Sequence, residues 1–294
     1  MIDLGKGPPI VLIPGIQGRW EWMRPAVEAM AARARVLSYS LCGDRGSGCR
    51  LDAQRGFENY MAQLESVLDQ AGLRTAALCG VSYGGLIAVH YAARHPEKVS
   101  ALVLASAPGP AWRPERRLMK YLRAPRLLVP LFVVRSLRVV AREVAAALPG
   151  RRERWAWRRR HYGYVLRAPA SPVRMARRIR FALDVDFTKD CGSVTAPTLV
   201  ITGEEGLDRI VGIDTTRDYL RRIPGAQHAT FAATGHLGVV TQPGRFAEIV
   251  GDFVESSGQK VQNRAVRGDE AERGVGTPAS EELGGVQGAP PFKQ

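Results

Sequence analysis

The sequence has no apolar run long enough to span a bilayer. The stretch from Leu127 to Val134 is short and contains Pro130, whereas a spanning helix needs about 20 apolar residues. The first residues, Met1 to Pro9, also lack the charged start and the apolar core of a signal peptide. We therefore expect a cytoplasmic protein.

Cysteine is scarce, and its spacing points to no particular site. The chain has 4 cysteines, none of them in a CxxC pair: Cys42, Cys49, Cys79 and Cys191. This spacing predicts neither a zinc site nor a disulfide framework. Cys42 and Cys49 could meet across a loop, but free thiols are the expectation in a reducing cytoplasm.

Acidic residues are too few to balance the basic ones, and the shortage is local. The net charge is +14 over 294 residues. Residues 112–182 contain 19 Arg and one Lys against Glu115, Glu143 and Glu153, a balance of +17, while the rest of the chain carries −3. The basic excess therefore belongs to one segment. The hydrophobic content of 45% is ordinary for a globular protein with a buried core.

Short apolar runs alternate with helical patterns along the chain. Six runs are typical of strands, at residues 10–14, 35–40, 75–79, 99–105, 197–202 and 227–232. Helices are expected at about 20–33, 54–71, 83–94 and 243–254. This alternation predicts an α/β fold with a mostly parallel, doubly wound sheet of about six strands, covered on both faces.

The basic segment interrupts this pattern, and the composition changes near the C-terminus. Residues 1–111 and 183–255 are expected to form the α/β core, with residues 112–182 inserted between its fourth and fifth strands. From Ser256 onward apolar side chains are rare, so residues 256–294 are expected to form a disordered tail.

The string Gly-Val-Ser-Tyr-Gly-Gly at residues 80–85 lies between the third predicted strand and the helix that begins at Tyr83. A G-x-S-x-G string is weak evidence alone, but at a strand–turn–helix junction it places a serine on a tight turn above the sheet. The helix N-terminus behind it stabilises developing negative charge. We interpret Ser82 as a nucleophile; the alternative is a glycine-rich turn that only connects two elements.

A serine hydroxyl needs a base to take its proton. Among the five histidines, His236 follows the last strand in the loop Gly-His-Leu-Gly, at the edge of the sheet where catalytic groups collect. His228 falls within that strand and is expected to be a sheet-face residue. His236 is therefore the predicted base.

The third member of such a site is a carboxylate in the loop after the fifth strand. Glu204, Glu205 and Asp208 compete there. Asp208 is our choice, and a surface salt bridge or a helix-terminal charge is the alternative role for it.

An oxyanion requires two backbone N–H donors. One is predicted at Tyr83, directly after the nucleophile. The other is predicted at Ile16, in the glycine-flanked loop after the first strand, although that loop could also be an ordinary turn.

Four motifs occur in a familiar order: Pro-Ile-Val-Leu-Ile-Pro-Gly, Gly-Val-Ser-Tyr-Gly-Gly, Pro-Thr-Leu-Val-Ile-Thr-Gly with Asp-Arg-Ile-Val behind it, and Gly-His-Leu-Gly. Through them, residues 8–255 resemble the α/β-hydrolase superfamily, in its esterase and lipase branch. The resemblance implies a triad of Ser82, Asp208 and His236, with no cofactor and no metal ion.

The sequence departs from that family at three points. Pro14-Gly15 stands where the family often has His-Gly, and the stretch before Asp208 is longer than usual. The family's first strand pair is missing, so we expect a sheet trimmed at the N-terminus. Ser82 stands where the dehalogenase and epoxide-hydrolase branches carry aspartate, which argues against those activities.

In the family, the segment that corresponds to residues 112–182 forms a helical cap over the active site. Here Arg135, Arg138 and Arg142 are spaced to form one basic helical face. This face could be simply solvated, or it could contact an anionic membrane or steer an anionic substrate. No recognisable motif supports nucleic-acid binding.

Together these features predict a serine hydrolase that acts through an acyl-enzyme on an ester, or a thioester, of a small and largely apolar molecule. An acyltransferase would use the same intermediate. The rival from another class is a catalytically silent scaffold that binds a ligand or an anionic membrane through its cap.

Overall fold

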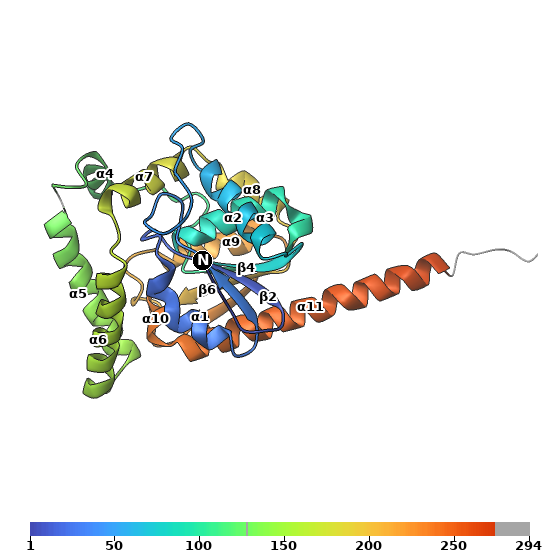
Figure 1. Cartoon of the computed structure of the whole chain (residues 1–294). Coiled ribbons are helices and arrows are strands. Elements are labelled where there is room, and N and C mark those ends of the chain that lie inside the picture. The colour runs from blue at the N-terminus through green and yellow to red at the C-terminus, as the bar shows by residue number, and fades with distance from the viewer. Residues whose placement is uncertain (128, 274–294) are drawn as a thin grey trace, which may run out of the picture. The chain divides into compact units, whose positions relative to one another are not determined.

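The computed structural model describes residues 1–127 and 129–273. Strands form one open sheet between two layers of helices (Figure 1). The seven strands are β1 (Ile2–Leu4), β2 (Pro9–Ile13), β3 (Arg35–Ser38), β4 (Ala76–Val81), β5 (Val99–Ala105), β6 (Thr198–Gly203) and β7 (Gln227–Phe231). Their order is β1-β3-β2-β4-β5-β6-β7. Only β1 is antiparallel to its neighbour in this sheet; the other pairs are parallel.

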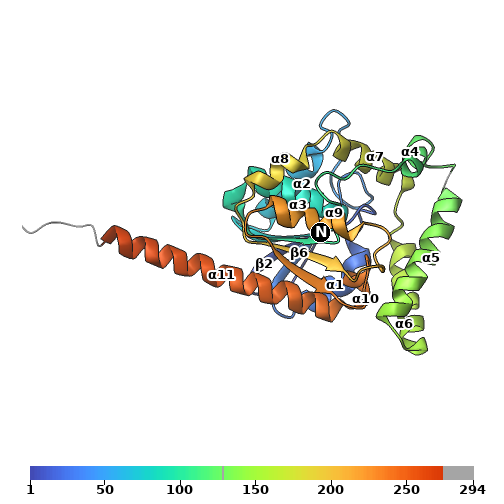
Figure 2. The ribbon, with the colours of Figure 1, turned by 180° about the vertical axis from the view of Figure 1, so that it is seen from behind.

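Both faces of the sheet are apolar, because successive side chains of a strand point to opposite sides. Val11 and Ile13 face one core, whereas Ile10 and Leu12 face the other. The first core is closed by α2 (Glu58–Gln70), α3 (Tyr83–Arg94), α8 (Phe187–Ser193) and α9 (Ile213–Arg222). The second is closed by α1 (Arg24–Met30), α10 (Gly238–Thr241) and the first turns of α11 (Pro243–Arg273) (Figures 1 and 2). Short 3-10 helices, η1 (Trp20–Met23) and η2 (Pro96–Lys98), complete the connections.

The basic segment is helical. Between β5 and α8 the chain forms α4 (Arg116–Arg123), α5 (Val129–Ala147), α6 (Arg151–Arg167) and α7 (Pro172–Leu183). In both views α5 and α6 run side by side at one side of the sheet (Figures 1 and 2). We call residues 112–183 the cap. The side chain of Arg135, one member of the predicted basic face, lies outside the described part of the structure.

All six predicted strands are present, and β1 is a seventh that the sequence did not reveal. Its three residues are too few to show an alternating pattern. The strand pairs with β3, where a salt bridge between Asp3 and Arg35 joins the two strands. The described sheet therefore has seven strands, one more at its N-terminal end than expected.

One further expectation is wrong. Cys42 and Cys49 form a disulfide instead of remaining free thiols, with their Cα atoms 4.9 Å apart. The intervening loop folds back because Gly43, Gly46 and Gly48 all adopt positive φ. The expectation of free thiols assumed a reducing cytoplasm, and the cytoplasmic address itself stays a prediction.

Residues 256–273 of the predicted C-terminal tail belong to a helix, and the disorder of the tail stays a prediction. Helix α11 continues from the core to Arg273, and this stretch is rich in good helix formers such as Glu, Gln, Arg and Ala. Residues 274–294 lie outside the described part. The compact unit of the chain is Met1–Gly258, and Gln259 begins a separate unit. Over the described residues, no helix combines the length and the apolar character needed to cross a membrane.

Candidate active site

Ser82 occupies the turn between β4 and α3. Its backbone adopts φ 52° and ψ −123°, a conformation that non-glycine residues rarely take. The turn is fixed because the Ser82 N–H donates to the Ala105 carbonyl of β5 and the Gly85 N–H donates to the Ser82 carbonyl, both at 2.8 Å. This strained elbow raises the serine above the carboxyl end of the parallel strands.

Gly80 and Gly84 allow the strand and the helix to come this close. A Cβ at Gly80 would collide with the backbone of Gly84, and a Cβ at Gly84 would collide with the Ile13 carbonyl of β2. Both positions therefore require glycine for a steric reason, which the sequence pattern had suggested.

Asp208 and His236 come together from the loops after β6 and β7. The His236 Nδ1 and the Asp208 Oδ2 are 3.2 Å apart, and the exposed fractions of the two side chains are 11% and 2%. The other carboxylate oxygen, Oδ1, accepts the backbone N–H groups of Ile210 and Val211 at 3.0 and 2.9 Å. The motif Asp-Arg-Ile-Val thus fixes the orientation of its own carboxylate.

The pKa values of this pair move apart. Burial works to lower the pKa of His236, but the hydrogen bond and the charge of Asp208, with the charge of Glu143, raise it above its ordinary value. Burial works to raise the pKa of Asp208, but its bonds with His236 and with the two backbone N–H groups outweigh burial and lower it. Both shifts favour a protonated His236 imidazolium beside an ionised Asp208 carboxylate.

The competing carboxylates have other roles. Glu204 is exposed, and its Oε2 accepts the N–H of Ala233 at 2.7 Å, which braces the loop before His236. Glu205 is exposed. In the described structure neither forms a hydrogen bond with His236.

Ser82 and His236 line the same cavity. No hydrogen bond joins these two side chains in the described residues. Catalytic hydrogen bonds often shorten only when a substrate binds. Ser82 and His236 therefore stay the predicted nucleophile and base. His228 lies on β7, where its Nε2 is 2.9 Å from the Thr202 hydroxyl, in agreement with its predicted place on the sheet.

The two predicted oxyanion donors flank the serine. Ile16 and Tyr83 line the same cavity as Ser82. Tyr83 is the first residue of α3, so its N–H has no partner within the helix. The described structure contains no acceptor for the Ile16 N–H either. Their role as oxyanion donors stays a prediction.

Sequence reasoning missed Arg178, which it counted among the basic cap residues. Arg178 is only 1% exposed. It forms a buried ion pair with Asp44, and its Nη1 donates to the Ile16 carbonyl at 2.8 Å, while its own carbonyl accepts the Tyr83 hydroxyl at 2.9 Å. The cap helix α7 is thus bonded to both residues of the predicted oxyanion hole.

Glu143 of α5 was also missed. It is 1% exposed, and its Oε1 accepts the backbone N–H groups of Gly235 and Leu237, the two neighbours of His236. A signal was present in the sequence: Glu143 lies on the same helical face as Val140, Val144 and Ala147, where a solvated acid is not expected.

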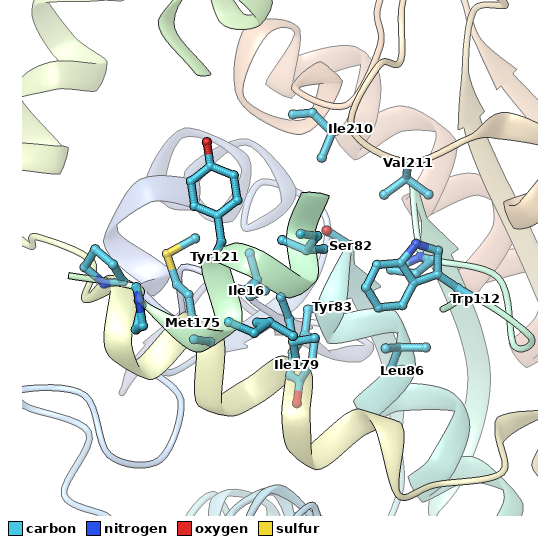
Figure 3. A pocket seen from close by; sticks show the side chains of 16 residues that line it. Ile16, Ser82, Tyr83, Leu86, Trp112, Tyr121, Met175, Ile179, Ile210 and Val211 are labelled. Carbon is cyan, nitrogen blue, oxygen red and sulfur yellow. The ribbon is translucent and has the colours of Figure 1, made fainter. Parts of the chain in front are cut away.

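Two apolar cavities meet at Ser82. The first, of about 210 Å³, is lined by Ser82 together with residues of α3, α4 and α7. In Figure 3, Ile16, Met175 and Ile179 lie on one side of the serine, and Trp112, Leu86 and Val211 lie on the other.

The second cavity, of about 450 Å³, extends from Ser82 and His236 toward α5 and α6. Its walls include Leu137, Val140 and Val165 of the cap. His161 also lines it, stacked on Trp157 with ring centroids 4.6 Å apart. Burial lowers the pKa of His161 to about 4, so its imidazole is neutral at pH 7.

The described walls of both cavities lack the strongly charged residue types. Of the described residues that line them, none is Arg, Lys, Asp or Glu. Across residues 1–127 and 129–273, no group of three or more His, Cys, Asp or Glu side chains is arranged to hold a metal ion.

A family model described as alpha/beta hydrolase fold matches residues 8–243 of this sequence. The chain belongs to the α/β-hydrolase fold family. Among curated relatives, it is 28% identical over 278 residues to 2-hydroxymuconate semialdehyde hydrolase of Pseudomonas sp. (strain CF600), covering 86% of this chain and 88% of that protein. The family named from the sequence motifs is thereby confirmed, and its relatives are hydrolases.

Solved structures show the same α/β-hydrolase fold. The enol-lactonase from Burkholderia xenovorans LB400 superimposes with a TM-score of 0.70 at 21% identity, covering 86% of this chain and 95% of that one. An esterase from Thermogutta terrifontis gives a TM-score of 0.69 at 22% identity, covering 87% and 92%.

Proposed function

We propose that this α/β hydrolase is a serine esterase that cleaves an ester with apolar groups on both sides of the scissile bond. The observation that carries the proposal is the position of Ser82, on a strained elbow between two uncharged cavities. One cavity accommodates the acyl group and the other the alcohol. The esterase and the lactonase among the structural neighbours act on the same type of bond by name.

The reaction proceeds in two stages. His236 takes the proton of the Ser82 hydroxyl while the serine oxygen attacks the ester carbonyl carbon. The N–H groups of Ile16 and Tyr83 stabilise the oxyanion of the tetrahedral intermediate. The carbon–oxygen bond to the alcohol then breaks, and the alcohol leaves with the proton from His236.

The acyl group remains on the Ser82 oxygen at this point. A water molecule gives a proton to His236 while its oxygen attacks the acyl carbon; the bond from that carbon to the Ser82 oxygen then breaks, and His236 returns the proton to the serine as the acid leaves. Asp208 holds the imidazole in one orientation and stabilises its charged form in both stages.

The uncharged walls also distinguish substrates. A carboxylate in either cavity would be desolvated with no Arg or Lys among the described lining residues to pair with it, which is costly. We therefore favour a neutral ester over a carboxylate substrate of the kind that the name of the muconate relative denotes. A thioester of the same shape would fit the same cavities.

The test compares the p-nitrophenyl ester of butanoic acid with the p-nitrophenyl monoester of succinic acid. The two acyl groups have the same chain length, and only the second carries a carboxylate. We expect kcat/KM to be higher for the butanoate by about tenfold or more, from the cost of burying an unpaired charge. Equal or faster hydrolysis of the succinate would refute the neutral-ester proposal.

Product analysis in the presence of an added alcohol separates hydrolysis from acyl transfer. Free acid as the main product supports a hydrolase, whereas a new ester as the main product supports an acyltransferase. A silent scaffold would produce neither.

We also propose that the outer face of α6 contacts an anionic membrane surface. Trp155 and Leu166 are 63% and 80% exposed, and their spacing of eleven residues puts them on one face of the helix. Tyr162, which is 37% exposed, also lines the second cavity and so lies at the border of this face. The Arg159 guanidinium lies 5.3 Å from the centre of the Trp155 ring. Such a mixture of basic and aromatic side chains is typical of helices that lie at a bilayer interface.

A further inference from the structure

The cap places a second buried carboxylate beside the catalytic loop. Glu143 belongs to α5, more than ninety residues before His236 in the sequence, yet it is 1% exposed and lies against the loop that carries His236. Burying an acid so completely is costly unless strong hydrogen bonds compensate for the lost water.

The hydrogen bonds of Glu143 go to the loop itself. Its Oε1 accepts the N–H of Gly235 at 2.9 Å and also the N–H of Leu237. These two amides belong to the residues directly before and after His236, so one carboxylate oxygen is hydrogen-bonded to the loop on both sides of that residue. The other oxygen, Oε2, is buried and has no hydrogen-bond partner among the described residues.

Packing alone does not account for this arrangement. An apolar residue at position 143 would avoid the cost of desolvation, and so a charged group at this position requires another reason. Burial raises the pKa of Glu143 above its ordinary value, while the backbone N–H groups of Leu237 and Gly235 and the charge of His236 act against burial and favour the ionised carboxylate. This carboxylate faces His236 from the side of the cap.

We propose that Glu143 is a positioning residue for the esterase reaction: it holds the His236 loop in place and adds a second negative charge that stabilises the imidazolium. This inference rests on the proposed function for its role in turnover. Glu143 also links the cap to the predicted triad, because its hydrogen bonds to the His236 loop require α5 to pack against that loop.

The charged groups around His236 define what a substitution would change. Asp208 faces the imidazole from the loop after β6, and Glu143 faces it from α5. Glu204, from the same loop as Asp208, reaches only the Ala233 amide. Both facing carboxylates raise the pKa of His236, so loss of either charge should lower it.

The test uses two substitutions that separate charge from hydrogen bonding. Glu143→Gln keeps an oxygen that can accept both N–H groups but removes the charge, and Glu143→Ala removes both. Glu153→Gln is the matched control, because Glu153 is an exposed glutamate on the neighbouring cap helix α6. Circular dichroism and thermal midpoints establish that each variant is folded.

For Glu143→Gln we expect the acid limb of the kcat/KM profile to move to lower pH, with KM for the butanoate ester unchanged. For Glu143→Ala we expect kcat to fall by about 100-fold or more, the loss that corresponds to two charge-assisted hydrogen bonds. Glu153→Gln should leave both quantities unchanged. An unshifted acid limb in Glu143→Gln together with near-normal kcat in Glu143→Ala would overturn the proposal.

A second measurement does not depend on turnover. The titration of the His236 ring, followed by NMR and assigned by its absence in His236→Ala, should have a lower midpoint in Glu143→Gln than in the wild type. If the wild type hydrolyses no ester but this shift is present, the proposed function fails and the role of Glu143 stands. If esters are hydrolysed and the titration is unshifted, the role of Glu143 as a charge partner fails alone.

Discussion

Replacing Asp208 by asparagine removes the charge that faces His236 while preserving the size of the side chain. The Oδ1 contacts with the Ile210 and Val211 amides can remain, so the loop should stay folded. We expect kcat to fall by about 10⁴, the scale of this change in another triad.

Glu204→Gln and Glu205→Gln are the matched controls for Asp208→Asn. Each removes a charge from the same loop, and each should change kcat only slightly, because both side chains are exposed and neither bonds to His236. A large loss in either control with a small loss in Asp208→Asn would show that the acid has been assigned to the wrong residue.

The pH dependence of activity follows from the state of His236. Only the neutral imidazole can accept the Ser82 proton, so kcat/KM should increase with pH through the pKa of His236. Since that pKa is raised above 6.5, the midpoint of the acid limb should lie on the alkaline side of this value. A midpoint below 6.5 in the wild-type pH profile would contradict the described environment.

A buried ion pair joins cap helix α7 to the α/β core. Arg178 on α7 and Asp44 in the loop after β3 are both almost inaccessible to solvent, with side-chain exposures of 1% and 0%. Arg178→Met should destabilise the fold by about 3–5 kcal/mol, because Asp44 would keep a buried charge without its main partner. Chemical denaturation measures this loss.

Arg174→Gln is the control for this element. Arg174 also contacts Asp44, at 3.4 Å, but its side chain is 41% exposed, so its loss should cost much less. Adding Asp44→Asn to Arg178→Met should recover part of the stability. Equal stability of Arg178→Met and wild type would mean that the buried pair contributes nothing.

The elements that the sequence predicted well were those with a local cause. The strands at 99–105 and 197–202 are continuous apolar runs, and the serine elbow requires glycines at fixed offsets, so neither depends on distant residues. Arg178 and Glu143 could not be placed in the same way. Their partners lie more than ninety residues away, and only the folded cap turns these charges inward.

Charge is unevenly distributed over the whole molecule: the cap carries the basic excess, and the rest of the chain is slightly acidic. Most described cap arginines are exposed, including the run Arg158, Arg159 and Arg160 on α6. Each basic residue near an anionic bilayer contributes about 1 kcal/mol, and this contribution fades over about a Debye length. The protein should therefore bind phosphatidylglycerol vesicles at low salt and lose most of that binding at high salt.

Co-sedimentation measures this binding, with phosphatidylcholine vesicles as the neutral comparison. Replacement of Arg158, Arg159 and Arg160 by Gln should weaken the anionic binding. The same replacement at Arg50, Arg55 and Arg74, three exposed arginines of the core, should have little effect. Equal losses in the two triple variants would indicate a response to net charge rather than a cap surface.

The central claim is that Ser82 is the nucleophile, and covalent labelling tests it most directly. A fluorophosphonate reacts with a serine only where a base activates it, so peptide mapping by mass spectrometry should find one adduct, on Ser82. The adduct should be lost in Ser82→Ala, and its formation should be far slower in His236→Ala, while both variants stay folded. An adduct on another residue, or no adduct on the folded wild-type protein, would contradict the account.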